Sequence, residues 1–485
     1  MRTGNTKNII IPGYFIVISL ILLSVIYAFA YPGKTKQLYT VPQDSLSAEI
    51  RSQLQSGSRE LFFPKTVGRF YAANNYQQVW LKPQSGTGST WQAMLMLDCV
   101  LQFGLSHADY HPHELMYNKL HEILENPNTI SVHQQARFEI MLTDAMINFM
   151  NNLHFGKLNP YINDGQQDEQ LIDGYDAAAL LTNALKQKDL MTAVGNVQPQ
   201  NSAYVTLQQY MQLRVGQESG DCYQVPESEI RKMAINLNRL RWADLDHNAY
   251  IQINIPTFTL TLHEPDSTYN FKVIVGKPQN QTPELNSDIT YFTTAPEWKV
   301  PNKIFRNEIL PKLNNIASYD DLQYAIYDNN GKYIPNNADA LKKVMAAPHN
   351  YHATQSSGCD NALGLVVFRF PNIYDVFLHD TPEKQLFNRP ARDFSHGCIR
   401  VEKAAELASL LLKYDGQANK VKEMQRAITH EQTVNFNFKK HVPIRITYIT
   451  CSRGEWGLDS CKDIYDLDNR LEMALYQDGS RVAAR

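Results

Sequence analysis

The sequence lacks an excess of either charge: 46 Lys and Arg stand against 49 Asp and Glu, which gives a net charge of −3. The basic residues also form no stripe along any segment. Proteins that bind nucleic acids draw the phosphate backbone through clustered Lys and Arg. We therefore predict no nucleic-acid partner.

Metal-ligand clusters are equally scarce. His107, His111 and His113 lie close together, but no Cys and no second cluster accompanies them. A zinc site needs three or four such ligands around one point. We therefore expect these histidines to lie in a solvated loop, and we predict neither a metal nor an organic cofactor.

Cysteine is infrequent, at six residues. Cys451 and Cys461 are near neighbours in a late polar segment. They could form a local disulfide or remain two free thiols, and the sequence does not favour either alternative. Cys359 is either a small loop residue or a second thiol near a site. Cys99 and Cys222 read as structural or exposed. Cys398 is the cysteine that stands in a chemically suggestive context.

A long apolar run is confined to the N-terminus, where residues 9–30 follow Arg2 and Lys7. The run is long enough to span a bilayer as a helix. Ala28-Phe29-Ala30 also fits a cleavage site for a signal peptide. We expect residues 1–37 to act as an inner-membrane anchor, with a cleaved signal as the alternative, and the rest of the chain to be periplasmic.

Cys398 follows a patterned stretch. Val376 and Leu378 fall on one face of an alternating run, and Phe377 and His379 fall on the other. Leu- and Ala-rich residues 404–414 are spaced as in a helix. The pattern therefore predicts that Cys398 lies in a turn between a strand and a helix.

That position would suit a nucleophile. A thiol reacts as its thiolate, which a helix amino end and the nearby Arg392 and Arg400 would favour. His379 could accept the thiol proton, and Gly397 would let backbone amides approach an oxyanion. The other interpretation is a buried structural Cys packed beside a His.

A resemblance to a known family adds to this interpretation. His379, a loop, and then Ser395-His396-Gly397-Cys398-Ile399-Arg400 resemble the signature of the L,D-transpeptidases, which have a YkuD-type catalytic domain. The surrounding residues resemble the large YcbB-like branch, over roughly residues 230–450. They are Asn238-Arg239, Asn254-Ile255-Pro256, Val275-Gly276-Lys277, Trp298-Lys299-Val300-Pro301, Asn361-Ala362-Leu363-Gly364 and Leu378-His379-Asp380-Thr381-Pro382.

The resemblance implies an enzyme that transfers an acyl group between peptidoglycan tetrapeptide stems, with one stem as donor and one as acceptor, to give a 3→3 crosslink. Cys398 would be the nucleophile and His379 its base, oriented by the backbone carbonyl of Asp380. Amides around His396 and Gly397 would stabilise the oxyanion.

The remaining roles are less fixed. The substrate-binding set comprises Arg400, Ser395 and Asn361; Arg400 would hold a carboxylate or pack structurally, and Ser395 would shape the turn. The acceptor could be another stem, a lipoprotein Lys or a free D-amino acid. A thiol carboxypeptidase or endopeptidase that uses water, and a wall-binding scaffold without activity, are the rival functions.

The expected fold is α+β. Residues 38–217 are predicted to form a helical scaffold, in which Phe138, Leu142, Ala145, Phe149 and Leu153 mark one apolar face of a long helix. A linker follows at 218–229, and a β-rich sandwich at 230–450 would be the catalytic domain, with a partly helical lid inserted at 298–352. Residues 451–485 form a C-terminal extension.

Overall fold

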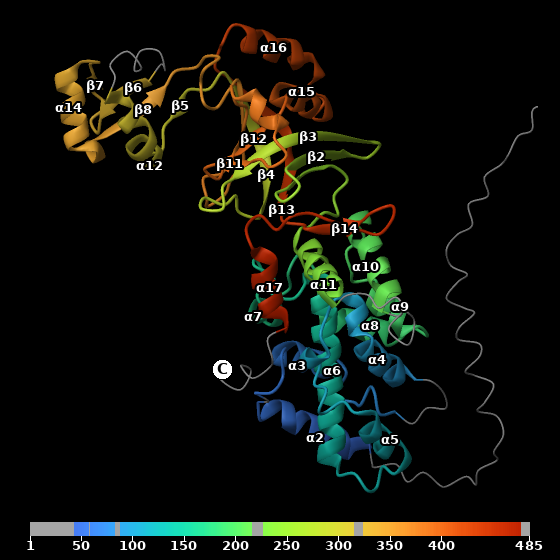
Figure 1. Ribbon diagram of the computed structural model, residues 1–485. Coiled ribbons are helices and arrows are strands. Elements are labelled where there is room, and N and C mark those ends of the chain that lie inside the picture. Colours follow the sequence, from blue (N-terminus) through green and yellow to red (C-terminus); the bar gives the residue numbers. More distant parts are fainter. Residues whose placement is uncertain (1–42, 58, 83–87, 216–226, 315–323, 477–485) are drawn as a thin grey trace, which may run out of the picture.

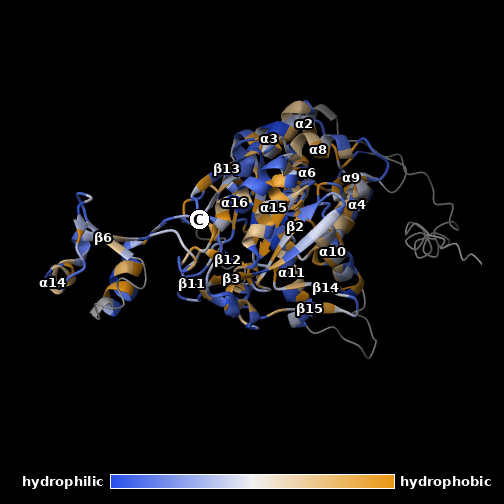
Figure 2. Cartoon of the chain, turned by 90° about the horizontal axis from the view of Figure 1, so that it is seen from above, coloured by the Kyte–Doolittle hydropathy of each residue, from blue (hydrophilic) through white to orange (hydrophobic). Residues whose placement is uncertain are grey.

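The computed structural model describes residues 43–476 except 58, 83–87, 216–226 and 315–323. A helical domain occupies the lower half of Figure 1, a sheet domain lies above it, and an insertion projects to one side of the sheet. The view from above in Figure 2 also places the insertion to one side. The α+β prediction is confirmed, because helices and strands are segregated along the chain.

One long helix, α6 (Val132–Phe155), forms the centre of the helical domain (Figure 1). The five apolar residues that predicted this helix are all buried, and so are most of the others along its length. A helix buried on nearly every side must be surrounded by other elements. Helices that pack on it are α2 (Gln43–Gln55), α3 (Pro64–Ala73), α4 (Ser89–Asp98), α8 (Ala177–Ala184) and α9 (Leu190–Gly195). The shorter helices α5 (Tyr117–Glu125) and α7 (Asp164–Glu169) complete the domain.

Two further helices join the helical domain to the sheet domain. α10 (Ser202–Val215) and α11 (Glu227–Trp242) share a core with Tyr250 and Ile449 of the sheet domain. Gly104 contacts α11 so closely that an added Cβ would lie 2.7 Å from Ala234 Cα. The predicted start of the catalytic domain, residue 230, lies within α11, so the helix continues across that boundary. Most of the predicted linker, residues 218–229, lies outside the described residues.

Among the described residues, nine strands form the large sheet in the order β11-β3-β12-β10-β9-β4-β13-β1-β2. β2 also pairs with β3, so the ladder closes on itself. The predicted sandwich is thus corrected to a closed, barrel-like sheet, in which no main edge is left unpaired. The strands are β1 (Tyr250–Asn254), β2 (Thr259–Glu264), β3 (Ser267–Gly276), β4 (Leu285–Thr294), β9 (Val366–Arg369), β10 (Leu378–His379), β11 (Asp393–Ser395), β12 (Ile399–Val401) and β13 (Val434–Thr447).

Apolar side chains from segments early and late in the sequence of this domain fill the interior of the sheet. Ile251, Ile253, Val366, Leu378 and Ile399 belong to one buried cluster with the inner faces of the two helices α15 (Ala404–Tyr414) and α16 (Val421–Thr429). The alternation seen in the sequence, apolar inward and polar outward, is what a sheet with one buried face requires. The chain then forms a hairpin, β14 (Cys451–Arg453) and β15 (Leu458–Ser460), and ends in α17 (Leu467–Tyr476).

The insertion is a small folded unit with its own core. Its four strands pair in the order β5-β8-β6-β7, and Val300, Phe305, Ile326 and Val344 are buried together. The predicted mixture of helix and strand is present. The elements are β5 (Trp298–Lys299), α12 (Asn302–Ile304), a π-helical turn (Phe305–Ile309), β6 (Tyr324–Asp328), β7 (Tyr333–Ile334), α14 (Ala338–Ala346) and β8 (Tyr351–Gln355).

The predicted anchor at residues 9–30 lies outside the described residues. Within the described part of the chain, none of the helices combines the length and the apolar character that a bilayer-spanning helix needs.

Candidate active site

Cys398 lies between two strands. It follows β11 and immediately precedes β12, and α15 begins only after β12 has ended. The prediction of a strand-to-helix turn is therefore wrong, because the three-residue strand β12 separates Cys398 from the helix. The partial charge of a helix amino end falls off within a turn, so α15 is not the source of thiol activation.

His379 reaches the same face of the sheet as Cys398. β10 and β12 run parallel, with Leu378 opposite Ile399 and His379 opposite Arg400. Leu378 and Ile399 both point into the buried core, so their neighbours point to the other face. Cys398 and His379 thus share one face on adjacent strands, which is the juxtaposition that the sequence required.

Backbone groups of Asp380 and Leu363 hold the imidazole of His379. Its Nδ1 lies 2.6 Å from the Asp380 carbonyl oxygen, and a carbonyl can only accept, so Nδ1 carries the proton. Nε2 is then the nitrogen with a lone pair. Asp380 is fixed in turn, because its carboxylate accepts from the Leu365 amide at 3.1 Å and from the Lys384 ammonium. The predicted orienting role of Asp380 agrees with this geometry.

Burial keeps both reacting groups neutral. Burial and the charges of Arg400 and Arg369 together lower the pKa of His379 to about 3. Burial also raises the pKa of the Cys398 thiol, although the amide of Phe377 opposes this. The resting pair is therefore a thiol and an imidazole, rather than a thiolate and an imidazolium.

Arg369 is a site residue that sequence reasoning missed. Its guanidinium carbon lies 4.2 Å from the centroid of the Phe377 ring, and its charge lowers the pKa of Cys398. β9 pairs antiparallel with β10, which aligns Arg369 with Phe377 on the face of Cys398. The alternation Val366, Phe368 could have identified it, because those residues face the core and Arg369 must face the opposite way.

The two arginines that we expected near the thiol are otherwise engaged. Arg392 donates to the carbonyls of Val273, Arg389 and Phe258, on the outer side of β3. The guanidinium of Arg400 pairs with the carboxylate of Glu383 and is largely buried. Because Arg400 is already paired within the described residues, the structural role is favoured over the binding of a substrate carboxylate. Its charge still acts on the site by lowering the pKa of His379.

Ser395 shapes the turn that carries the nucleophile. Its Oγ donates to the Cys398 carbonyl at 2.5 Å and accepts from the Gly397 amide at 3.1 Å. Gly397 has φ +120°, a conformation that suits glycine. Because the Gly397 amide is engaged, the His396 and Cys398 amides remain as the donors for an oxyanion. Asp375, with φ +53°, aims its carbonyl at Cys398, 3.9 Å from Sγ.

The insertion contacts the motif through His396. Nε2 of His396 lies 2.5 Å from a carboxylate oxygen of Glu308, in the π-helical turn of the insertion. Asn361 is fully buried at the base of the insertion, where its side-chain amide donates to the carbonyls of Pro296, Gln355 and Ser356. Asn361 therefore joins the two connecting segments, rather than making the substrate contact that we predicted.

We expected His107, His111 and His113 to lie in a solvated loop; this holds for the exposed His113, whereas His107 and His111 are partly buried. His111 is mostly buried, with Nε2 2.6 Å from the carboxylate of Asp144, and His107 bonds the carbonyl of Asp98 at 2.6 Å. His113 offers only its carbonyl, to Lys119. The three side chains thus have separate surroundings.

The other cysteines of the described chain are free thiols. Cys451 and Cys461 lie beside each other at the β14–β15 hairpin without a disulfide, which decides between the two alternatives. Burial raises the pKa of Cys451 to about 12. Cys359 is exposed, and Cys222 lies outside the described residues.

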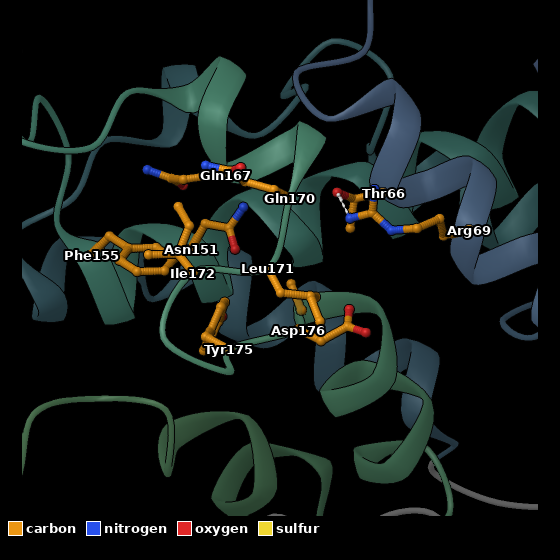
Figure 3. Close-up of a pocket in the computed structure, with 11 residues that line it drawn as sticks. Thr66, Arg69, Asn151, Phe155, Gln167, Gln170, Leu171, Ile172, Tyr175 and Asp176 are labelled. Atoms are coloured by element: carbon orange, nitrogen blue, oxygen red, sulfur yellow. Dashed lines mark hydrogen bonds between the residues drawn. The ribbon is translucent and has the colours of Figure 1, made fainter.

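Two cavities differ in what they could hold. The one in Figure 3 lies in the helical domain between α6 and the segment around Leu171 and Tyr175, and its free volume of about 10 Å³ has room for one water molecule. The other has a volume of about 380 Å³ and adjoins the motif at His396 and Gly397. Only the second has the size of a ligand site.

Comparison with known proteins now bears on this geometry. Residues 248–422 match the YkuD family, described as the L,D-transpeptidase catalytic domain, and residues 65–211 match the Scaffold domain family. The chain carries an L,D-transpeptidase catalytic domain. A Haemophilus influenzae protein named "Putative L,D-transpeptidase" is 25% identical over 447 residues, which cover 91% of this chain and 84% of that protein.

The match places the site inside the L,D-transpeptidase domain. His379, the Ser395–Arg400 motif, Arg369 and the whole insertion fall within residues 248–422. The hairpin β14–β15 and α17 lie beyond both matched segments.

Proposed function

We propose that this protein is a peptidoglycan L,D-transpeptidase that forms 3→3 crosslinks between tetrapeptide stems through a thioester on Cys398. The observation that carries the proposal is the shared sheet face of Cys398 and His379, with the imidazole oriented by the Asp380 carbonyl. The match of residues 248–422 to the L,D-transpeptidase catalytic domain supports the proposal.

Acylation begins from the neutral pair. The sulfur of Cys398 attacks the carbonyl carbon of the meso-diaminopimelate residue as the thiol proton passes to Nε2 of His379. The resulting oxyanion is stabilised by the His396 and Cys398 amides. The bond to D-Ala then breaks, and His379 returns the proton to the departing amine, which leaves a thioester and a neutral imidazole.

Deacylation reverses these roles. The side-chain amine of a second stem attacks the thioester carbon and gives a proton to His379. The carbon–sulfur bond breaks as the new amide forms, and the sulfur takes the proton back. The low pKa of His379 favours the return of the proton in both halves, because an imidazolium with a low pKa is a strong acid.

The cellular setting is part of the proposal. Peptidoglycan stems lie outside the inner membrane, so the catalytic domain would act in the periplasm. The apolar residues 9–30 would hold the chain to the inner membrane, or would direct its export and then be removed.

Purified protein and tetrapeptide muropeptides test this function. The wild type should give dimeric stems and free D-Ala, and Cys398→Ala should give neither, with a loss of about 10⁴-fold or more. Cys99→Ala, which alters a thiol remote from the motif, should retain activity. Trimmed monomers without dimers would instead indicate a peptidase, and dimers from Cys398→Ala would refute the proposal.

A further inference from the structure

The cavity beside the motif has one acidic side chain among its walls. The loop that joins β3 and β4 contributes Gln281–Glu284, the segment before β10 contributes Tyr374 and Val376, and α17 contributes Leu467. Among these lining residues, only Glu284 bears a carboxylate. The cavity volume of about 380 Å³ accommodates part of a peptide stem.

This cavity adjoins the turn that carries the reacting sulfur. Val376 and Gly397 line it, and each lies within two residues of the contact between Cys398 Sγ and the Asp375 carbonyl. The wall is fixed to the motif, because Thr282 Oγ1 donates to the Gly397 carbonyl at 2.8 Å. A group held in this cavity therefore lies against the Gly397 turn, which precedes Cys398.

Charge divides the surroundings of Cys398 into two sides. Arg369 and Arg400 lie along β9 and β12, on the His379 side of the thiol. Glu284 lies on the cavity side, where its carboxylate accepts from the Tyr448 amide. Its charged neighbours Arg239 and Asp468 form an ion pair with each other. The Arg369 guanidinium suits a ligand with carboxylates, and the Glu284 carboxylate suits a ligand with an ammonium group.

We propose that this cavity binds the acyl acceptor, a second tetrapeptide stem, with the Glu284 carboxylate holding its side-chain ammonium group. This inference rests on the proposed function. A free amino acid would leave much of the cavity unfilled. Tyr374 and the scaffold residue Tyr161 are both exposed near Glu284 and offer further contact area to a stem.

Glu284 can also accept the proton that the acceptor ammonium group must lose before it attacks the thioester. An ammonium nitrogen has no lone pair, so it must give one proton to the carboxylate before the neutral amine can attack the thioester carbon. The new carbon–nitrogen bond then replaces the carbon–sulfur bond, the second proton reaches the sulfur through His379, and Glu284 releases its proton to water. Burial raises the pKa of Glu284, which favours this transfer.

The cavity depends on the segment beyond both family matches. Tyr465 donates its hydroxyl to the Gly276 carbonyl at 2.6 Å, and its oxygen accepts from the Thr282 amide at 3.3 Å. Leu467, at the start of α17, completes the wall. Acceptor binding would therefore need the C-terminal extension as well as the catalytic domain.

The test varies the acceptor concentration with the full chain at fixed donor stem. Glu284→Gln should raise the KM for the acceptor stem about 10- to 100-fold, as expected for loss of a hydrogen bond to a charged group. D-Ala release in the first turnover should stay at the wild-type rate. The acceptor KM of Glu284→Asp should lie between the values for the wild type and for Glu284→Gln. Glu264→Gln, on the distant β2–β3 hairpin, should have the acceptor KM of the wild type.

Hydroxylamine supplies a second readout, because this nucleophile is uncharged at neutral pH. Wild type and Glu284→Gln should release the donor to hydroxylamine at equal rates. The proposed acceptor site would be overturned if Glu284→Gln and the wild type had equal KM values for the acceptor stem. It would also be overturned if Glu284→Gln lost as much activity with hydroxylamine as with the stem. If the wild type forms no dimers at all, the proposed function itself fails, which is a distinct result. Free D-amino acids used as well as stems would overturn the choice of acceptor.

Discussion

Buried titratable groups in the two domains are used in opposite ways. In the helical domain, Glu139 accepts from the backbone amides of Val79, Trp80 and Leu81 and from the hydroxyl of Tyr71. In the catalytic domain, the Asp380 carbonyl anchors Nδ1 of His379 and leaves the lone pair of the ring on Nε2. Burial alone therefore does not mark a functional group.

The same contrast holds for the other acids of the helical domain. Asp144 accepts from the Phe62 and Phe63 amides at 2.9 Å, and Asp168 accepts from the Lys65 and Thr66 amides. These carboxylates tie loops to helices, because a buried amide without an acceptor is costly. The number of atoms left for a ligand distinguishes such structural acids from reactive groups.

Replacement of Glu139 should give the largest effect. Glu139→Leu leaves three backbone amides without an acceptor, at about 1–3 kcal/mol each, so the helical domain should lose at least about 3 kcal/mol of stability. Hydrogen exchange along α6 measures this loss. Glu169→Gln, an exposed acid paired with Lys65, is the control, and an unchanged α6 would contradict the structural role.

Gly364→Ala should disturb the anchor of His379. Gly364 has φ +61°, and an added Cβ would lie 2.6 Å from the side chain of Asp380, whose carbonyl orients His379. A displacement of this size should lower kcat about 100-fold. Gly331→Ala, which has φ +79° and no atom within 4 Å of the added Cβ, should leave kcat unchanged. Equal effects of the two substitutions would refute this role of Asp380.

The pH dependence of acylation tests whether the pair rests in its neutral state. Because the pKa of His379 is lowered to about 3, the base stays unprotonated down to pH 5, and the rate should be nearly flat from pH 5 to 7. A histidine with an ordinary pKa of about 6.5 would lose about 30-fold by pH 5. Carbapenem adduct formation, followed by intact mass, measures this rate.

Arg400→Met sharpens the same experiment. It removes a charge that lowers the pKa of His379, so the acidic fall in rate should move to higher pH. Lys413→Met, in the last turn of α15, should not move it. A wild-type fall centred near pH 6.5 would show that His379 is not the buried, neutral base described above.

Glu308→Gln tests a half-exposed pair, Glu308 with His396, against the buried groups above, and it should give the smallest effect. Pairs of this kind contribute about 0–1 kcal/mol, so acylation should change by less than about fivefold. Hydrogen exchange in α12 and the π-helical turn should rise slightly. Asp339→Asn, on α14 away from the motif, is the control. A change beyond tenfold would place Glu308 with the reacting groups.

Local pattern predicted much of this protein. The period of the apolar residues identified α6 and the faces of β10, and the motif identified Cys398, His379 and the Asp380 carbonyl. The helix-end activation of Cys398 was wrong because a three-residue strand is too short to leave a periodic signal. Asn361 was misassigned because its partners Pro296 and Gln355 are joined only by the folding of the insertion.

The sequence by itself determined which residues could react and which side of a strand each one takes, since both follow from residue type and from neighbours along the chain. Only the tertiary structure decided that Arg369 lies beside the thiol, that Glu284 faces a cavity and that His379 is neutral. Those properties depend on strand order and on the exclusion of water, which arise from contacts between segments far apart in the chain.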